Sequence, residues 1–314
     1  MTYTRDWDTA QVGFGPEVRE LIATALTPRE PSLVVRAGTY VVDPPFFGNG
    51  DIGRLAVCGA VNDLAATGAD PRHLALGIVL EAGLPLDLVH RLTASVREAA
   101  AEAGVAVTAV DTQVVRAGEA DRVYVTATAF GERAGPALGP DRVRPGDRVL
   151  VTGPLGDHAA HLVSLRDGLG YEYHVPSDCA PLNDLLREVR ADLHHALPAA
   201  GGGLAETLRL TAAARGLTLR VDESAPPVRP GTRVALATRG LAPLDAACAG
   251  SLCLFVPPDR TGTVLTALRA HPRGRHAAVV GEVTADRRGD VEYVTPDGAR
   301  TRTPSAGPLP ERLL

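Results

Sequence analysis

The stretch TYVVDPPFFGNGDIGRLAVCGAVNDLAATGADPRHLALGIVLEAGLPL, residues 39–86, is the most informative part of this 314-residue chain for its fold. Its middle part, residues 51–68, carries apolar side chains at helical spacing and has Asp51 at the N-cap position. The flanking segments 32–42 and 73–80 are rich in β-branched and other apolar residues, which predicts strands. The stretch therefore predicts a strand, a helix and a second strand.

The same alternation continues on both sides of a Gly- and Pro-rich segment at 132–147, which has no periodicity and predicts the domain boundary. Before that segment we expect a helix over 86–103 and strands over 105–110 and 121–131. After it we expect strands over 148–153, 217–223, 251–257 and 277–283, and helices over 157–166, 180–195, 203–215 and 259–270.

The fold class is therefore α+β with two domains. Residues 1–140 are expected to form a domain around a mixed sheet, and residues 141–314 an α/β sandwich that ends in a mobile, Pro-rich tail at 303–314. A chain of 314 residues is long enough for two cores, because single cores usually stop growing near roughly 250 residues.

Composition excludes several classes of protein. Hydrophobic residues make up 45% and charged residues 22%, as is typical of a globular protein. No apolar run approaches the roughly 18 residues that a membrane-spanning helix needs, and the start MTYTRDWDTA is too polar for a secretory signal. The net charge of −5 is spread over interspersed acids and bases. We therefore expect a cytoplasmic protein with neither a membrane nor a nucleic-acid partner.

All 32 basic side chains apart from histidine are arginine, and the chain contains no lysine. A Schiff-base lysine, a phosphate-binding lysine or a lysine general base is therefore excluded, because arginine does not titrate in their place. Genomic base composition alone would also favour arginine over lysine. The four cysteines, Cys58, Cys179, Cys248 and Cys253, form no CxxC pair and are expected to be buried and reduced.

Six residues of the opening stretch carry a family resemblance: Ile52, Gly53, Asn62, Asp63, Gly68 and Pro71. With them, residues 39–86 resemble a signature of the HypE family, which does hydrogenase-maturation chemistry and belongs to the PurM/AIR-synthase superfamily. The resemblance continues through 111–125, 150–160, 177–183, 222–228 and 271–283. It implies a PurM-like two-domain fold whose first domain dimerises.

The resemblance also implies a site for ATP and Mg²⁺. From the residues alone, Gly48, Gly50 and Asp51 open a helix whose free amides suit an anion, and carboxylates at Asp63 and Asp111 suit magnesium. A solvated helix carboxylate and a polar strand cap are the alternatives for these two acids. The predicted nucleotide-binding residues are Gly50, Asp51, Asn62, Asp63, Asp111 and Thr112, of which Asp63 and Asp111 would bind Mg²⁺.

The chain departs from the family pattern at positions that carry chemistry. Where the family has a Thr-Asp-Ser-Tyr run, this chain has Ala37–Tyr40, and where the family has Gly-Asp-Thr-Lys, this chain has Val110–Gln113. An Asp-x-Thr-Arg-Gly-Gly run becomes Pro198–Gly203, and an Asn-Glu-Gly-Lys run becomes Cys248–Ser251. An acid for the metal, the lysines and an acid/base group are therefore absent, and ATP binding is expected to be weakened or lost.

Both ends of the chain also differ from the family. The His-Gly-x-Gly-Gly run near the N-terminus reads Val12–Pro16. HypE proteins end in Pro-Arg-Ile-Cys, whose thiolate carries the carbamoyl group, and this sequence ends Leu309–Leu314 with no thiol. No catalytic group of the family is expected to be intact. His158, in the run GDHAA, is the remaining candidate for a general base, and a structural histidine is its alternative.

Three functions follow from this pattern. The first is a non-catalytic HypE-like scaffold that forms a homodimer, or a heterodimer with a HypE homologue, through strands at 33–42 and 121–130, and that binds a HypF-type carbamoyltransferase. The second is a repurposed ATP-dependent enzyme that phosphorylates an amide or carbonyl oxygen. The third is a working carbamoyl dehydratase that makes the thiocyanate precursor of the cyanide ligands of NiFe hydrogenase.

Overall fold

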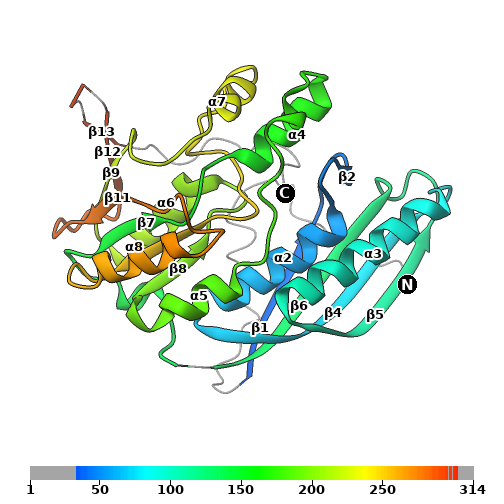
Figure 1. Ribbon diagram of the computed structural model, residues 1–314, viewed down its shortest axis with the longest axis horizontal. Helices are drawn as coiled ribbons and strands as arrows, with labels where there is room; N and C mark the ends of the chain where they lie inside the picture. Colours follow the sequence, from blue (N-terminus) through cyan, green and yellow to red (C-terminus); the bar gives the residue numbers. More distant parts are fainter. Residues whose placement is uncertain (1–32, 134, 296, 299, 303–314) are drawn as a thin grey trace, which may run out of the picture.

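A computed structural model describes residues 33–133, 135–295, 297–298 and 300–302. The first half of the chain forms a four-stranded mixed sheet in the order β1-β6-β4-β5, in which only the β4–β5 pair is parallel. Its strands are β1 (Leu33–Tyr40), β4 (Ala69–Glu81), β5 (Ala106–Val115) and β6 (Val123–Arg133). Helices α2 (Ile52–Ala65) and α3 (Leu86–Ala103) cover one face of this sheet (Figure 1).

The alternation of side chains explains why the helices cover that face only. On β6, Val123, Val125, Ala127 and Ala129 are buried, and the residues between them are half-buried or exposed. Among the residues that the structure describes, no element covers the opposite, outward face of the sheet. Edge strand β5 is the extreme case, because nearly all of its residues are exposed.

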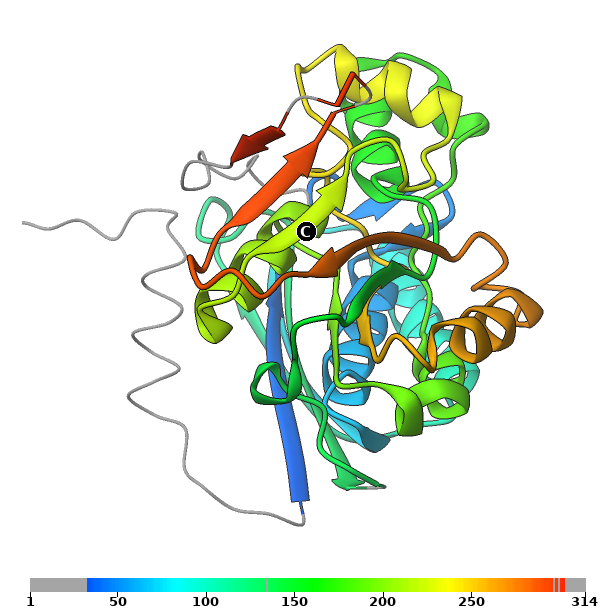
Figure 2. The same cartoon turned by 90° about the vertical axis from the view of Figure 1, so that its left-hand side faces the viewer.

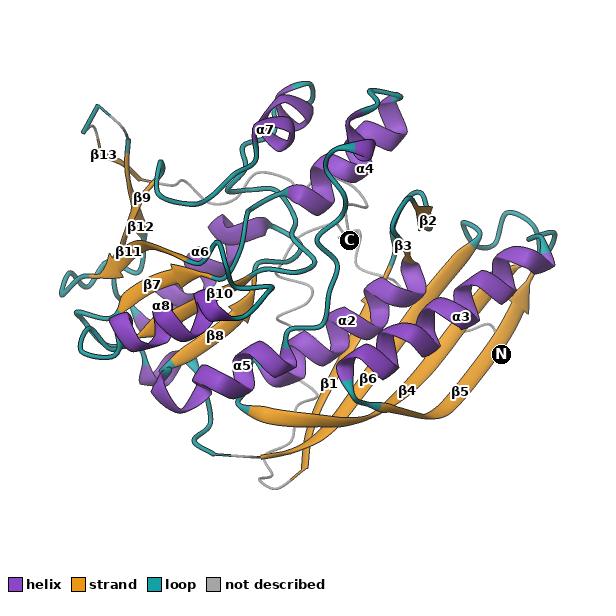
Figure 3. Cartoon of the chain, in the orientation of Figure 1, coloured by secondary structure: helices purple, strands orange, loops and turns teal. Residues whose placement is uncertain are grey.

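The second half forms a seven-stranded sheet with helices on both faces (Figure 3). Its order is β13-β12-β9-β11-β7-β10-β8, and its strands face the viewer in Figure 2. The strands are β7 (Arg148–Val151), β8 (His195–Pro198), β9 (Leu219–Asp222), β10 (Leu252–Val256), β11 (Ala278–Val283), β12 (Val291–Val294) and β13 (Arg300–Arg302). The core on one face includes α6 (Gly203–Arg215), and that on the other face includes α5 (Asn183–Val189) and α8 (Thr261–Ala270).

Three smaller elements lie beside the junction of the two halves. These are the hairpin of β2 (Phe46–Phe47) and β3 (Gly50–Asp51), helix α4 (Asp157–Asp167) and helix α7 (Pro230–Ala237). Short 3₁₀ turns occur at Pro140–Arg142, Tyr171–Tyr173 and Arg190–Asp192. Phe47 is fully buried, with its ring edge-on to those of His158 and His161 on α4. The first core therefore extends onto α4.

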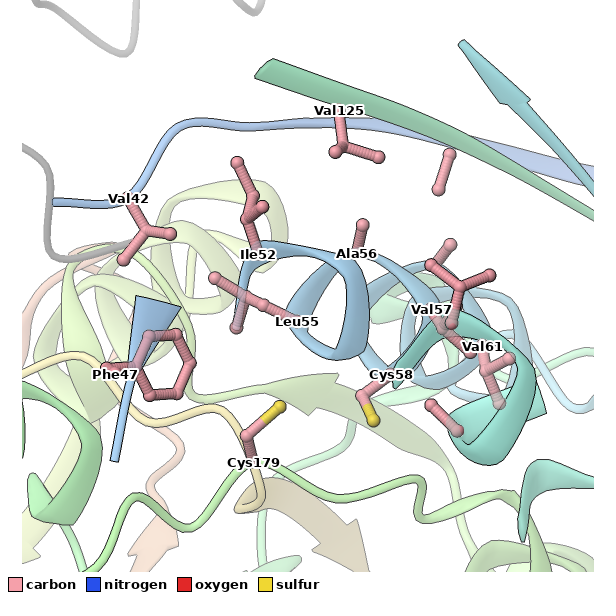
Figure 4. Close-up of a cluster of buried hydrophobic side chains, with 14 of the residues drawn as sticks. Val42, Phe47, Ile52, Leu55, Ala56, Val57, Cys58, Val61, Val125 and Cys179 are labelled. Carbon is pink, nitrogen blue, oxygen red and sulfur yellow. The ribbon is translucent and has the colours of Figure 1, made fainter. Parts of the chain in front are cut away.

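The segment Ser177–Asn183 ties the two halves together by running along α2. Asn49 makes two hydrogen bonds to the backbone of Ser177, at 2.8 and 3.0 Å, and the Arg54 Nε donates to the Cys179 carbonyl at 3.1 Å. The thiols of Cys58 and Cys179 meet at this junction, close to Phe47 and Leu55 (Figure 4). All four cysteines are buried and free, as predicted.

The α+β class and the mixed first sheet are confirmed. The helix expected over 180–195 is wrong in its second half, because α5 ends at Val189 and the chain turns into β8. This edge strand is too short to show periodicity, and its position at the edge tolerates Pro198. Helix α7, which begins at Pro230, and strand β12 were not expected. The boundary at 140/141 stays a prediction, and the tail 303–314 lies outside the described residues.

Candidate functional site

The start of α2 is capped by its own chain. Asp51 adopts an extended backbone as the N-cap, and its Oδ1 accepts the Arg54 amide at 3.0 Å. The Gly53 amide also bonds to this carboxylate, and the Ile52 amide donates to the Pro45 carbonyl at 2.8 Å. Burial raises the pKa of Asp51, and the hydrogen bonds from the Arg54 and Gly53 amides oppose this rise. The amides expected to bind an anion beside Gly50 are therefore already used.

Asn62 bridges the two domains. Its Nδ2 donates to the Ala180 carbonyl at 3.0 Å and its Oδ1 accepts the Leu182 amide at 2.7 Å. The side chain is buried, with 3% exposure, so it has little surface for a ligand. In this chain Asn62 fastens the Ser177–Asn183 segment to α2, and its assignment to nucleotide binding stays a prediction.

Asp63 and Asp111 lie on opposite sides of the first sheet. Asp63 belongs to α2, where burial raises its pKa to about 6 and the Arg36 guanidinium on β1 opposes that rise. Asp111 is paired with Gly77 across the parallel β4–β5 ladder. Because the neighbouring Leu76 is buried toward the helices, Gly77 and Asp111 face outward.

The two acids are also far apart along the sheet. Strands β6 and β4 separate β1, which carries Arg36, from β5, so about 14 Å of sheet lies between them. Within one chain Asp63 and Asp111 therefore do not fit a shared Mg²⁺ ion. No cluster of three or more metal-binding side chains occurs among the described residues. Thr112 is exposed on β5 and is paired with the buried Ile78, so it lies on the helix side of the sheet, opposite to the face that carries Asp111.

His158 lies in the core of α4 rather than in an open loop. The side chain has 0% exposure, and its Nδ1 lies 2.7 Å from the Ser177 Oγ. A general base needs to reach its substrate, and this ring is enclosed by Phe47 and the Ser177–Asn183 segment. The structure favours the structural alternative for His158.

A cavity of about 260 Å³ lies where the motif segments of the second domain meet. The resembling segments 150–160, 177–183 and 271–283, far apart in sequence, contribute to its wall, together with Arg229 and Gly250. The lining residues are Gly153, Pro154, Asp157, Asp178, Ala180, Arg229, Gly250, Pro272, Arg273, Arg275 and His276. Three of the segments that carry the family resemblance therefore share this hollow with Arg229 and Gly250.

Two carboxylates in the wall have raised pKa values. Asp157 is paired with Arg229 at 2.8 Å and accepts a hydrogen bond from Thr232; its burial raises the pKa against these two contacts. Asp178 accepts the amides of Ala249 and Gly250, at 3.0 and 3.1 Å. Burial raises the pKa of Asp178 to about 7, against its two amide partners and with the Asp157 charge adding to the rise. A carboxyl group that titrates near neutral pH in a cavity is a candidate functional group.

Asp178, Arg229, Arg273, Arg275 and His276 were missed as site residues, although four of them lie within resembling segments. The signal in the sequence that could have pointed to them was the family resemblance of the segments that contain them. Their spacing along the chain gives no indication that they share a wall, because each segment belongs to a different loop.

Among the described residues no helix is long and apolar enough to cross a membrane.

The profile of the N-terminal domain of AIR synthase related proteins matches residues 22–133, and that of the C-terminal domain matches residues 144–294. The fold is thus the two-domain PurM-like fold of AIR synthase related proteins. The carbamoyl dehydratase HypE of Azotobacter vinelandii is 42% identical over 270 residues, which cover 85% of this chain and 79% of that protein. The chain belongs to the HypE family.

Solved structures agree. A hydrogenase maturation protein HypE in complex with ATP has a TM-score of 0.86 and 39% identity, over 92% of this chain and 89% of that one. The HypE–HypF complex contains a chain with a TM-score of 0.86 and 30% identity, over 92% of this chain and 99% of that one. The similarity therefore extends over both domains.

Proposed function

We propose that this chain is a HypE-type hydrogenase maturation protein that has lost carbamoyl dehydratase activity and acts as a non-catalytic partner. The named relatives support the pathway. The observation that carries the loss of activity is the composition of the cavity wall. Where the family pattern has an acid and a lysine, this chain has Ala249 and Ser251, on either side of the wall residue Gly250, and the Ser251 hydroxyl donates to the Gly153 carbonyl at 3.4 Å.

The part of the first domain that the structure describes supplies no replacement. Gln113, which stands where the family has a lysine, is exposed on β5 and paired with Val79, so it lies on the outward face with Asp111. Asp63 is on the other side of the sheet, near Arg36. Phosphate transfer from ATP depends on positioned cations around the phosphates. The described residues of the first domain do not bring such a set together.

Activity is tested by incubating the purified chain with ATP, Mg²⁺, carbamoyl phosphate and a HypF-type carbamoyltransferase. Intact-mass spectrometry should show an unmodified chain, and phosphate release should equal that of the transferase alone. The Azotobacter vinelandii HypE is the matched control and should turn over in the same mixture. Any carbamoyl- or cyanide-derived mass increase on this chain would contradict the proposal.

The partners proposed are a second HypE-type chain and a HypF-type protein, in the cytoplasm. The outward sheet face supports the first, because Leu33 and Val35 on β1 are exposed at 59% and 38% and Phe130 on β6 is only half-buried. An apolar face that no described element covers is typical of an interface. The similarity to the HypE chain of a HypE–HypF complex supports the second.

One observation favours a second candidate, a repurposed ATP-dependent enzyme that activates an amide or carbonyl oxygen. Asp178 has a pKa of about 7 and lines the cavity, so it could exchange a proton with a ligand near neutral pH. Calorimetry with ATP and Mg²⁺ separates the candidates. Saturable heat supports the enzyme, and its absence at high protein concentration supports the partner.

A further inference from the structure

The cavity wall carries more cationic groups than its carboxylates can neutralise. Arg229 is held by Asp157 at 2.8 Å. Arg273 is held by Glu102 and, at 3.4 Å, by Asp184. These two guanidinium groups are therefore compensated.

Arg275 and His276 are not compensated in this way. The Arg275 Nε donates to the Pro272 carbonyl at 3.2 Å, and Arg275 makes no ion pair with any residue that the structure describes. His276 is exposed, also lines the cavity and interacts electrostatically with Asp157. The rim of the cavity formed by residues 275–276 thus has unused donors and the positive charge of Arg275.

The acids of the cavity have little capacity left to bind a cation. Asp157 is occupied by Arg229 and Thr232. Asp178 accepts one amide on each oxygen, from Ala249 and Gly250. Because the pKa of Asp178 is about 7, a substantial fraction carries a proton at neutral pH and can donate it in a hydrogen bond. The charged and titratable groups that surround Asp178 are Asp157, Cys179, Arg229, Cys248, Arg273, Arg275 and His276.

We propose that this cavity is a binding site for a small oxyanion, a carboxylate or phosphoryl group, held by Arg275 and His276 with Asp178 lining the same cavity. A planar guanidinium group presents two parallel N–H donors that match two oxygens of either group. The volume of about 260 Å³ lies below the roughly 300–1,000 Å³ of sites for drug-sized molecules, so the ligand is a small metabolite. This inference does not depend on whether the chain is an enzyme.

The test is calorimetric titration of the full chain with sodium phosphate and, separately, sodium malonate, at pH 6.5 and low ionic strength. Sodium chloride serves as the ionic-strength control. Both probes contain the proposed chemistry, so preferential binding of phosphate identifies a phosphoryl ligand and preferential binding of malonate a carboxylate. Absence of saturable binding by both probes overturns the proposal.

Variants locate the site. R275Q should weaken binding by about tenfold or more, since it removes a charge-assisted hydrogen bond. H276Q should weaken it by a smaller factor. R287Q changes an exposed arginine in the loop after β11 and is the matched control, expected to stay within about twofold of the parent chain. If R275Q folds by circular dichroism and binds the probe as tightly as R287Q does, the site is not here.

Discussion

Substitution of Asp178 by Asn should change how stability depends on pH. The folded state holds the proton of Asp178 up to about pH 7, whereas an unfolded chain releases it near pH 4. A raised pKa means that the folded state binds more protons than the unfolded state between these values, so folding stability is lost as pH rises from 4 to 7. Asn has no proton to lose, so the variant avoids that loss.

The magnitude follows from the shift of about three pH units, at about 1.4 kcal/mol each, which gives a ceiling of about 4 kcal/mol. Asp178 lines a water-accessible cavity, so solvent screens part of the effect, and we expect about 2 kcal/mol. The variant minus parent difference in unfolding free energy should therefore rise by about 2 kcal/mol between pH 4.5 and pH 8. Any constant cost of leaving the Ala249 or Gly250 amide without its acceptor cancels in this comparison.

Urea unfolding followed by circular dichroism at pH 4.5, 6, 7 and 8 measures the difference. Asp259→Asn is the matched control, because that side chain is 75% exposed and its variant should show a nearly flat difference. A flat profile for Asp178→Asn, or a difference that falls as pH rises, would refute the reasoning that Asp178 is held protonated by its surroundings.

Three further changes test other contacts. Asn62→Ala should lower the unfolding free energy by about 2–3 kcal/mol in urea, since it leaves the Leu182 amide and the Ala180 carbonyl without partners; an unchanged midpoint would contradict the bridging role. Val35→Arg places a charge on the outward sheet face and should halve the mass measured by light scattering without changing the unfolding midpoint; a parent chain that is already monomeric would rule out the dimer. Asp51→Ala removes the N-cap of α2 and should lower the free energy of unfolding by about 1 kcal/mol, which lowers the thermal midpoint; an unaffected midpoint would show that the cap is dispensable.

The parts of the fold that the sequence predicts are those set by local chemistry. The start of α2 at Asp51 follows from a cap and a helical apolar pattern within one turn of each other, and both are confirmed. Strand β8 could not be predicted, because four residues carry no periodicity and their strand conformation comes from pairing with β10, more than fifty residues further on.

The candidate site was harder to predict because it depends on which face of the sheet each side chain lies on. Whether Asp111 can reach Asp63 depends on its pairing with Gly77, and a shift of one residue in that register would turn the side chain to the other face. Similarly, the run GDHAA does not reveal that His158 is enclosed by Phe47, which comes from a hairpin more than a hundred residues earlier. Motif resemblance identifies the segments, and the sheet register decides which side chains meet.

The same distinction explains how the cavity would persist through the loss of catalytic groups that we propose. A Cβ atom on Gly250 would lie 1.8 Å from the Asp178 carbonyl oxygen, and one on Gly274 would lie 2.1 Å from the Leu268 carbonyl oxygen. These walls are therefore held by backbone contacts that only glycine permits. The Ala249 amide also contributes through its backbone, by donating to Asp178 at 3.0 Å, whatever side chain position 249 carries. Replacement of an acid there leaves the amide, the close approach at Gly250 and the shape of the hollow in place. Selection on chemistry can therefore relax at position 249 without any loss of the cavity, which remains available for another ligand.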